Sequence, residues 1–460
     1  MEKKSNNVLM GLSAFGAIFF VFGFATTFII QLSAPVRAVF DLSEFHAQLL
    51  TSAFFIAYPI MSVPTGWLVN RIGYKYTVVA GLILMALGSI IFIPAARIPS
   101  YPIFLLATFI LATGVVFLQV SANPYVTAIG PESSASSRLN LTQALNSIAT
   151  MVAPWLIAVV IFKGLDLPFD ATDNQKVEYG LEVANRIPFS FIVMALIVIV
   201  VAVTLLLIKL PVIAIDKTDK KSGSVYKQPH VLMGAFAIFC YVGAEAGNAG
   251  LMVNYLRSGS LGLTAEMAST YAAIYWGGAM VGRFFGSIMF SENVKAKKYM
   301  YASLVLLLAF VSGAFVTEWN WTIGAIFTGT SAINFVFMLI GKGQPARSLA
   351  VFALVAGALG LITTFTQGHV ALWTVVSIGL FNSIMFPNIF TLAVKDLKGG
   401  ELAGASGIIN SLILGGAVIP PIMGYVADEY SYTYAYVVPA ICYLYIFFYA
   451  VKGSKIRLAN

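Results

Sequence analysis

The chain has 460 residues, of which 59% are hydrophobic and only 10% are charged. A soluble chain carries about 25% charged residues, so too few charges remain here to cover a water-facing surface. The mean hydropathy of +0.88 agrees with this. The composition therefore excludes a soluble enzyme and a disordered scaffold, and it predicts an all-α polytopic membrane protein.

The net charge of +8 does not require a nucleic-acid partner. Membrane proteins concentrate Lys and Arg in cytoplasmic loops, and this explains a basic balance. Cys240 and Cys442 both lie in apolar runs. We therefore expect them to be packing residues, and we expect no disulfide framework.

Apolar runs long enough to cross a bilayer recur along the chain, because a spanning helix needs about 20 mostly apolar residues. Six runs precede the polar stretch AIDKTDKKSGSVYKQPH and eight follow it, which predicts about 14 transmembrane helices. The runs lie near 8–32, 47–69, 77–95, 101–130, 139–162, 188–213, 230–255, 265–290, 299–316, 321–340, 348–366, 370–394, 403–426 and 432–451.

The basic residues predict how these helices are oriented. Lys and Arg gather in the loops on the same side as the N-terminus, for example at Lys75, Arg138 and Lys220, and are sparse in the other loops. Cytoplasmic loops are the ones that carry excess Lys and Arg. We therefore expect both termini in the cytoplasm.

The two halves of the chain carry related polar signatures at nearly equal spacing. The first half has Asn123-Pro124, Asn146-Ser147 and Pro154, and the second half has Pro387-Asn388, Asn410-Ser411 and Pro420. Duplicated halves around a midplane site recur in transporters. The predicted organisation is a six-helix bundle over 1–213, a cytoplasmic linker over 214–229, and a C-terminal bundle over 230–460 with an extra hairpin within 299–347.

Polar side chains inside the predicted helices are candidates for a binding site, because such groups are costly against lipid. Gln119 and Asn123 lie four residues apart on one helix face, and Gln143 and Asn146 share a face of the next helix. Their chemistry suits a sugar, whose hydroxyl groups both donate and accept hydrogen bonds. The alternative is hydrogen bonding between helices, which polar side chains supply in many bundles.

The second half adds Asn248, Tyr275 and Asn382 to the candidate sugar contacts. Aromatic faces can cover the apolar face of a pyranose, and a few well-placed polar groups fix its orientation. As for the amides of the first half, the alternative is that these residues form hydrogen bonds between helices.

Glu245 is the acidic residue that the sequence places deep in an apolar span. A buried carboxylate either takes up a proton or is held by a cation. Glu245 is therefore the candidate coupling residue, for H⁺ or for Na⁺ bound nearby by hard oxygens. The alternative is a structural pair with Arg283, which we disfavour because Arg283 is expected nearer the cytoplasmic end. Arg71, Lys75 and Arg283 are expected to have gating or structural roles.

Several functional classes lack their signatures. The chain has no G-x-x-x-x-G-K-[ST] run, so nothing indicates a nucleotide-driven pump. His46, His230 and His369 are far apart, which disfavours a metal-dependent membrane hydrolase. The chain has no carbonyl-type filter sequence, so nothing indicates an ion channel. We expect no enzyme activity and no cofactor.

Several motifs resemble those of a known family. GWLVNRIGYK (66–75) resembles the loop motif of the major facilitator superfamily, with Asn70 where the usual pattern has Asp. LQVSANPYVTAIGPESSASSRLNLTQALNS (118–147) resembles the helix 4–5 signature of the fucose–galactose–proton symporter family, and in particular its bacterial glucose/galactose branch. GFATT (23–27), CYVGAEAGNAGLMVNYL (240–256) and FNSIMFPNIFTLAVKDL (381–397) are also similar to that family.

The resemblance implies a facilitator core that takes up sugar by alternating between inward-open and outward-open states. It also implies a site between the two halves that includes positions Gln119, Gln143 and Asn146. Fucose permeases carry an Asp on helix 1 and a Glu on helix 4, where this chain has Ile30 and Gln119. Neither side chain can hold a proton, so the resemblance leaves Glu245 as the ion carrier.

We therefore predict a transporter of the bacterial inner membrane that imports a hexose of the glucose or galactose type by symport with Na⁺ or H⁺. Its expected partners are a monosaccharide, the coupling cation and the lipid bilayer, and we expect a monomer. The alternatives are uptake of fucose or N-acetylglucosamine, uncoupled sugar diffusion, and a sugar sensor that does not transport.

Overall fold

The computed structural model describes residues 2–98, 100–129, 135–167, 171–208, 210, 228–289, 295–397 and 399–455. These residues form helices, and no strand occurs among them. The chain divides into two compact units, Met1–Leu42 with Leu49–Lys217 (unit 1) and Ser43–Gln48 with Thr218–Asn460 (unit 2). The predicted linker over 214–229 lies outside the described residues up to position 227.

Within the described residues, 12 segments are long and apolar enough to cross a membrane, against about 14 expected. The difference has two sources. One segment, Glu44–Arg97, is 54 residues long and contains two helices. The helix Ala265–Met289 is not among the 12, and it carries Arg283 and several glycines. The expectation of an all-helical, multi-pass membrane protein is confirmed.

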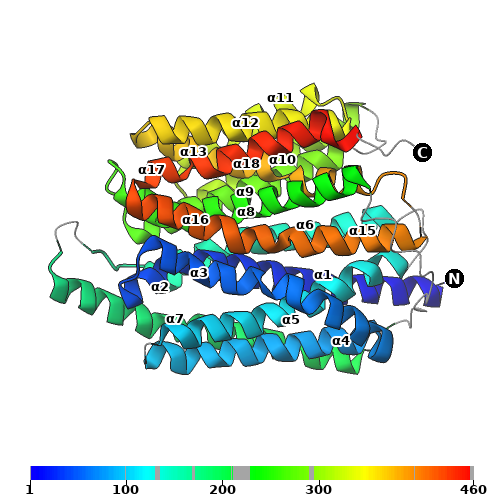
Figure 1. Ribbon diagram of the computed structural model, residues 1–460, viewed down its shortest axis with the longest axis horizontal. Coiled ribbons are helices and arrows are strands. Elements are labelled where there is room, and N and C mark those ends of the chain that lie inside the picture. Colours follow the sequence, from blue (N-terminus) through cyan, green and yellow to red (C-terminus); the bar gives the residue numbers. More distant parts are fainter. Residues whose placement is uncertain are drawn as a thin grey trace. The chain divides into compact units, whose positions relative to one another are not determined.

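Unit 1 holds seven α-helices of the described chain (Figure 1). They are α1 (Glu2–Gln31), α2 (Ser33–Phe40), α3 (Glu44–Phe55, whose first residues group with unit 2), α4 (Ala57–Arg97), α5 (Tyr101–Ala128), α6 (Ala135–Leu156) and α7 (Asp173–Leu207). A π-helix, Ile157–Phe162, extends α6 after Pro154. Helix α4 packs on α5 and α7, and α1 packs on α6.

Gly73 divides the longest segment into two spanning helices. At about 1.5 Å per residue, 54 residues of straight helix would measure roughly 80 Å, far more than a bilayer core of about 30 Å. Gly73 has φ 82° and ψ 169°, a conformation that only glycine adopts readily. The break falls inside the GWLVNRIGYK motif, between the two runs expected at 47–69 and 77–95.

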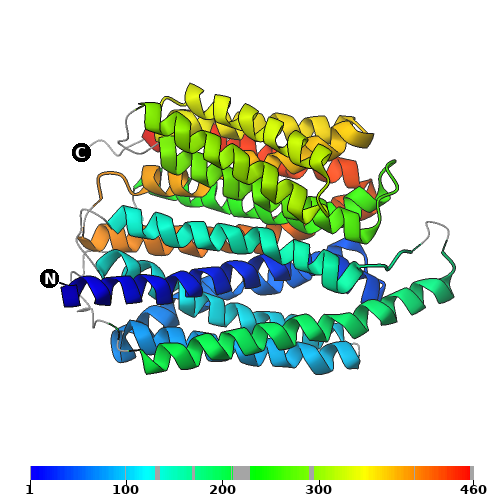
Figure 2. The same ribbon diagram turned by 180° about the vertical axis from the view of Figure 1, so that it is seen from behind.

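Helix α7 begins earlier than the apolar run expected from 188. Thr172 and Gln175 form a capping box, in which the Thr172 hydroxyl accepts from the Gln175 amide and Gln175 Oε1 accepts from the Thr172 amide at 2.8 Å. This cap starts the helix in the polar segment before that run, which includes Asp173, Glu178 and Glu182. The first turns of α7 project beyond the other helices of unit 1 (Figure 2).

Unit 2 contains the remaining helices. They are α8 (Pro229–Ser258), α9 (Ala265–Met289), α10 (Lys295–Val316), α11 (Trp321–Ile340), α12 (Pro345–Phe365), α13 (Gly368–Asn382), α14 (Met385–Ala393), α15 (Gly399–Ser411), α16 (Gly415–Glu429), α17 (Tyr432–Ala435) and α18 (Val437–Val451), with short 3₁₀ turns at Leu412–Leu414 and Gly453–Lys455. Helix α8 packs on α16 and α18, α9 packs on α13, and α12 packs on α18.

Helices α10 and α11 form the hairpin that was expected within 299–347. They pack on each other and on α9. Glu318 and Trp319 both have positive φ in the turn, and Asn320 Oδ1 accepts from the Ile323 amide to start α11. That this hairpin is an insertion relative to the first bundle stays a prediction.

The first residues of α3 are held within unit 2 by a polar cluster. Glu44 is buried, and its Oε1 accepts from Asn254 Nδ2 and from the Tyr432 hydroxyl, both at 2.7 Å. The Asp428 carboxylate accepts from the amides of Glu44 and Phe45 at 2.8 Å each, so it caps the start of α3 from a distant part of the chain. This cluster was not predicted from the sequence.

Candidate functional site

The carboxylate of Glu245 lies within unit 2 between a tyrosine and an arginine. Tyr241, one turn earlier on α8, donates from its hydroxyl to Glu245 Oε1 at 2.6 Å. Arg283 Nη2 on α9 lies 3.9 Å from the same oxygen, and the Glu245 side chain is only 14% exposed. A carboxylate so enclosed needs such partners, because burial without them is costly.

The expectation that Glu245 and Arg283 would not pair directly was therefore wrong. It compared the depths of the two backbone positions along the helices. An arginine side chain carries its guanidinium several ångströms from its Cα along the helix surface. Arg283 can therefore reach Glu245, although it starts nearer one end of the bundle.

Three more of the predicted residues meet in the interior of unit 2. Tyr275 on α9 donates to the Glu245 backbone carbonyl at 3.3 Å and accepts from Asn382 Nδ2 at 2.8 Å. Tyr443 on α18 donates to Asn382 Oδ1 at 2.7 Å and accepts from Asn248 Nδ2 at 3.0 Å. The four side chains are fully buried, to within 1%. The structure thus joins Asn248, Tyr275 and Asn382 into one network.

Tyr443 is a member of this network that the sequence analysis missed. It lies in an aromatic-rich run, YSYTYAYVVPAICYLYIFFYA, in which its hydroxyl has no distinguishing neighbour in sequence. Asn382 is the last residue of α13, and α14 begins shortly afterwards at Met385. Only the packing of α8, α9, α13 and α18 reveals the partners of these groups.

In unit 1 the four predicted amides have different surroundings. Asn146 on α6 is buried and donates from Nδ2 to the Phe19 carbonyl on α1 at 3.0 Å. Asn123 on α5 is half-buried, and its Oδ1 has no hydrogen-bond partner among the described residues. Gln119 and Gln143 are half-buried. The geometry supports an interhelical role for Asn146 and leaves Asn123 available to a ligand.

The predicted basic residues of the 66–75 motif lie at one end of unit 1. Lys75 Nζ donates to the Leu206 carbonyl at 3.0 Å and to the Ile208 carbonyl at 2.8 Å, at the end of α7. A cation at the C-terminus of a helix also opposes the negative end of its dipole. Arg71 is exposed and lies over the Trp67 ring, 5.1 Å from its centroid.

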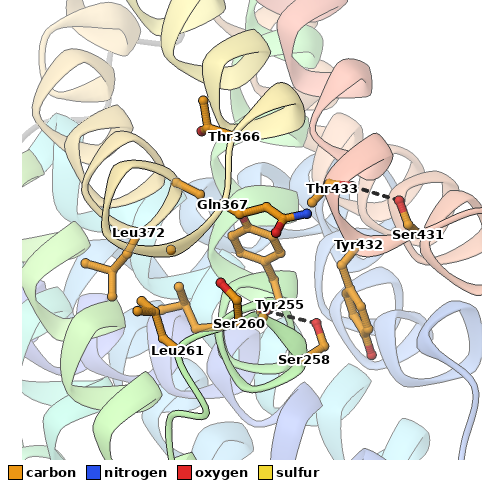
Figure 3. A pocket seen from close by; sticks show the side chains of 14 residues that line it. Tyr255, Ser258, Ser260, Leu261, Thr366, Gln367, Leu372, Ser431, Tyr432 and Thr433 are labelled. Carbon is orange, nitrogen blue, oxygen red and sulfur yellow. Dashed lines mark hydrogen bonds between the residues drawn. The ribbon is translucent and has the colours of Figure 1, made fainter.

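Within the described residues, no group of three or more His, Cys, Asp or Glu side chains is close enough to hold a metal ion. A separate cavity of about 380 Å³ opens at the end of unit 2 where α8 and α16 finish (Figure 3). Its lining is uncharged and includes Tyr255, Gln367, Ser431 and Tyr432. None of the predicted site residues lines it.

Comparison with known proteins places this helical architecture in a family. The sequence pattern of the Major Facilitator Superfamily matches residues 14–345, which is well over half of the chain. The chain belongs to the major facilitator superfamily. This confirms the family that the motifs of the sequence resemble, together with the facilitator fold.

Relatives in the superfamily match over nearly their whole length. The glucose/galactose transporter of Brucella abortus is 39% identical over 98% of this chain and 96% of its own. The L-fucose-proton symporter of Escherichia coli is 30% identical over 98% of this chain and 95% of its own. These relatives are named as transporters, in agreement with the expectation that this chain is not an enzyme.

Solved structures show the same relationship. A crystal structure of the Escherichia coli fucose:proton symporter matches with a TM-score of 0.65 and 28% identity, covering 98% of this chain and 100% of that one. A bacterial homologue of the lysosomal transporter Spinster matches with a TM-score of 0.61 at 15% identity, which reflects the shared fold alone.

Proposed function

We propose that this protein imports a hexose of the glucose or galactose type together with a proton. The relatives named as glucose/galactose transporter and as L-fucose-proton symporter support this substrate class and this ion. The observation that carries the proposal is the enclosed Glu245 carboxylate on α8, held between Tyr241 and Arg283. A titratable group of this kind inside a span is a natural proton carrier.

Protonation of Glu245 changes its relation to both neighbours. The neutral acid no longer attracts Arg283 electrostatically, and one of its oxygens becomes a hydrogen-bond donor. The ion pair between α8 and α9 therefore depends on the protonation state of this one side chain. We propose that this dependence links proton binding to the alternation between inward-open and outward-open states.

Amides and aromatic hydroxyls supply the sugar contacts in this proposal. Asn123 offers a buried acceptor without a partner among the described residues, and Gln119 and Gln143 are half-buried amides. Neutral donors and acceptors of this kind suit the hydroxyls of an uncharged sugar. Fucose or N-acetylglucosamine in place of glucose or galactose is the alternative within the same chemistry.

The test is transport in proteoliposomes. Uptake of labelled glucose, galactose, fucose and N-acetylglucosamine is measured under an imposed pH gradient and, separately, under an imposed Na⁺ gradient. We expect accumulation of a hexose under the pH gradient alone. Accumulation driven only by Na⁺ would replace the proton by Na⁺, equilibration without accumulation would indicate an uncoupled carrier, and sugar binding without any flux would indicate a sensor.

Glu245→Gln is the decisive variant. We expect it to lose at least tenfold of the accumulation driven by the pH gradient, because the amide cannot ionise, while exchange of labelled for unlabelled sugar persists. The control is Glu182→Gln, which removes a carboxylate that is 53% exposed and paired with Arg186 on α7. Unchanged accumulation in Glu245→Gln would show that this carboxylate does not carry the proton.

A further inference from the structure

A directed chain of hydrogen bonds runs through unit 2 and returns to the helix from which it starts. Among the described residues it has four steps: Tyr275 to the Glu245 carbonyl, Asn382 to Tyr275, Tyr443 to Asn382, and Asn248 to Tyr443. Glu245 and Asn248 are three residues apart on α8. The path between them passes through α9, α13 and α18.

The direction of every step follows from the first one. A backbone carbonyl can only accept a hydrogen bond, so the Tyr275 hydroxyl must donate its one proton to the Glu245 carbonyl. Asn382 must then present its NH₂ group to Tyr275, and this turns its carbonyl oxygen toward Tyr443. The orientation of this amide is therefore fixed by its partners and not by its own shape.

The hydrogen-bond directions of Tyr443 and Asn248 follow in the same way. Tyr443 donates its only proton to Asn382 Oδ1, so it can only accept from Asn248. Asn248 therefore faces Tyr443 with Nδ2, and its Oδ1 points away from the chain. This oxygen is fully buried and has no hydrogen-bond partner among the described residues. A buried acceptor left without a donor is costly, so it indicates a donor that the described residues do not supply.

We propose that Asn248 Oδ1 is a binding point for an O–H donor, either a hydroxyl of the transported sugar or a water molecule retained by the protein. Tyr275 is the positioning residue, because it acts on Asn248 only through Asn382 and Tyr443. The site accepts a group that donates a proton and rejects one that can only accept. The sugar as the source of the donor rests on the proposed function, whereas the polarity of the chain does not.

The polarity is tested with Asn248→Asp, by measuring the apparent unfolding temperature of the purified protein at about pH 5 and about pH 8. While the introduced carboxyl is protonated, it can still donate to Tyr443. Once ionised it can only accept, and the proton of Tyr443 is already committed to Asn382. We expect the variant to lose several degrees more than the parent between the two pH values. Glu245, Tyr241 and Arg283 are the same in both proteins, so the comparison with the parent removes their contribution.

Adding Tyr275→Phe to Asn248→Asp tests whether Tyr275 sets the polarity of the chain. Without the Tyr275 hydroxyl, Asn382 is free to turn, and Tyr443 can then donate to the ionised carboxyl. We expect the second substitution to restore at least half of the loss, although a purely structural role predicts additional damage. The matched control is Tyr271→Phe, one turn earlier on α9, which must leave the loss unchanged. If Tyr275→Phe adds to the loss, the polarity is not set by Tyr275 and the proposal is wrong.

The source of the donor is tested with sugar-induced shifts in unfolding temperature, using the transported hexose and its monodeoxy analogues on the parent and on Asn248→Leu. If the sugar donates, one analogue binds the parent roughly tenfold more weakly, and this deficit disappears in Asn248→Leu. If every deficit is the same in both proteins, the donor is water. Asn248→Ala provides the same comparison if the leucine variant does not fold. A lack of any sugar-induced shift contradicts the proposed function and leaves the pH experiment to decide the polarity.

Discussion

Asn123 and Asn146 show how one sequence pattern can place two like side chains in different surroundings. Both are asparagines on polar faces of neighbouring helices, and the sequence predicts sugar contacts for both. Asn146 donates from its side-chain amide to the Phe19 carbonyl. The helices pack closely at this point, because a Cβ on Gly23 would lie only 2.9 Å from the backbone carbonyl oxygen of Asn146. Asn123 has an oxygen without a partner among the described residues.

Leucine substitutions should separate these two roles. Asn146→Leu removes an interhelical hydrogen bond and should destabilise the protein by about 1 kcal/mol or more, with uptake of all sugars reduced in parallel. Asn123→Leu removes no described bond of Oδ1, so it should raise the KM for sugar severalfold at an unchanged unfolding temperature. Thermal unfolding and uptake kinetics on both variants give the answer. Equal losses of stability would contradict the distinction.

At the scale of the element, the turn at Gly73 separates the two helices of α4. A Cβ at this position would meet no atom within 4 Å, so a substitution there tests backbone conformation alone. The positive φ of 82° is costly for any residue with a Cβ. This conformation permits the segment Glu44–Arg97 to contain two spans.

We expect Gly73→Ala to destabilise the protein by about 1–3 kcal/mol, because alanine must adopt a positive φ with an extended ψ there, a conformation that is nearly restricted to glycine. The control is Gly66→Ala, which is also in open space but inside the helical part of α4. That substitution should be neutral or stabilising by up to about 1 kcal/mol. Thermal unfolding of the two variants in the same detergent measures the difference, and similar effects at both positions would refute the assignment of strain to Gly73.

The start of α3 depends on side chains of three other helices. Asn254 of α8, Asp428 of α16 and Tyr432 of α17 all hydrogen-bond to Glu44 or to its backbone amide. The approach is close, because a Cβ on Gly424 would lie 2.7 Å from the Glu44 carbonyl carbon. An acidic side chain in the first turn also suits the positive end of the α3 dipole.

Tyr432→Phe should loosen this end of α3 specifically. The variant loses one hydrogen bond to a carboxylate, worth about 1.5–3 kcal/mol, so amide hydrogen exchange over Glu44–Gln48 should accelerate roughly tenfold or more. Tyr434→Phe is the matched control on the same helix, because Tyr434 is 53% exposed. Exchange that is equally fast in both variants would contradict a role for the Tyr432 hydroxyl.

At the scale of the whole molecule, the basic residues predict which loops face the cytoplasm. Asp173, at the start of α7, is expected outside, and Gln344, between α11 and α12, is expected inside. Both positions are exposed. The natural cysteines, Cys240 and Cys442, are buried, so a single added cysteine can be labelled alone.

A membrane-impermeant thiol reagent applied to intact cells should therefore label Asp173→Cys and not Gln344→Cys. Permeabilised cells provide the control, in which both should react. Labelling of Gln344→Cys from outside would invert the proposed orientation, with both termini then outside the cytoplasm. Cross-linking and light scattering of the purified protein test the expected monomer.

The sequence by itself determined the membrane class, the order of the helices and the family, because hydrophobic length and Gly- and Pro-containing motifs are local properties of the chain. It also identified Glu245 and most members of the network around it, since a polar group inside an apolar run is visible without a structure. It could not identify Tyr443 or the Glu44 cluster, nor the pairing of Glu245 with Arg283. Those contacts join side chains of different helices, and they form only where packing brings the two groups together, to within about 3 Å for a hydrogen bond. Tertiary structure alone decided which polar groups are satisfied and which, like Asn248 Oδ1, have no partner among the described residues.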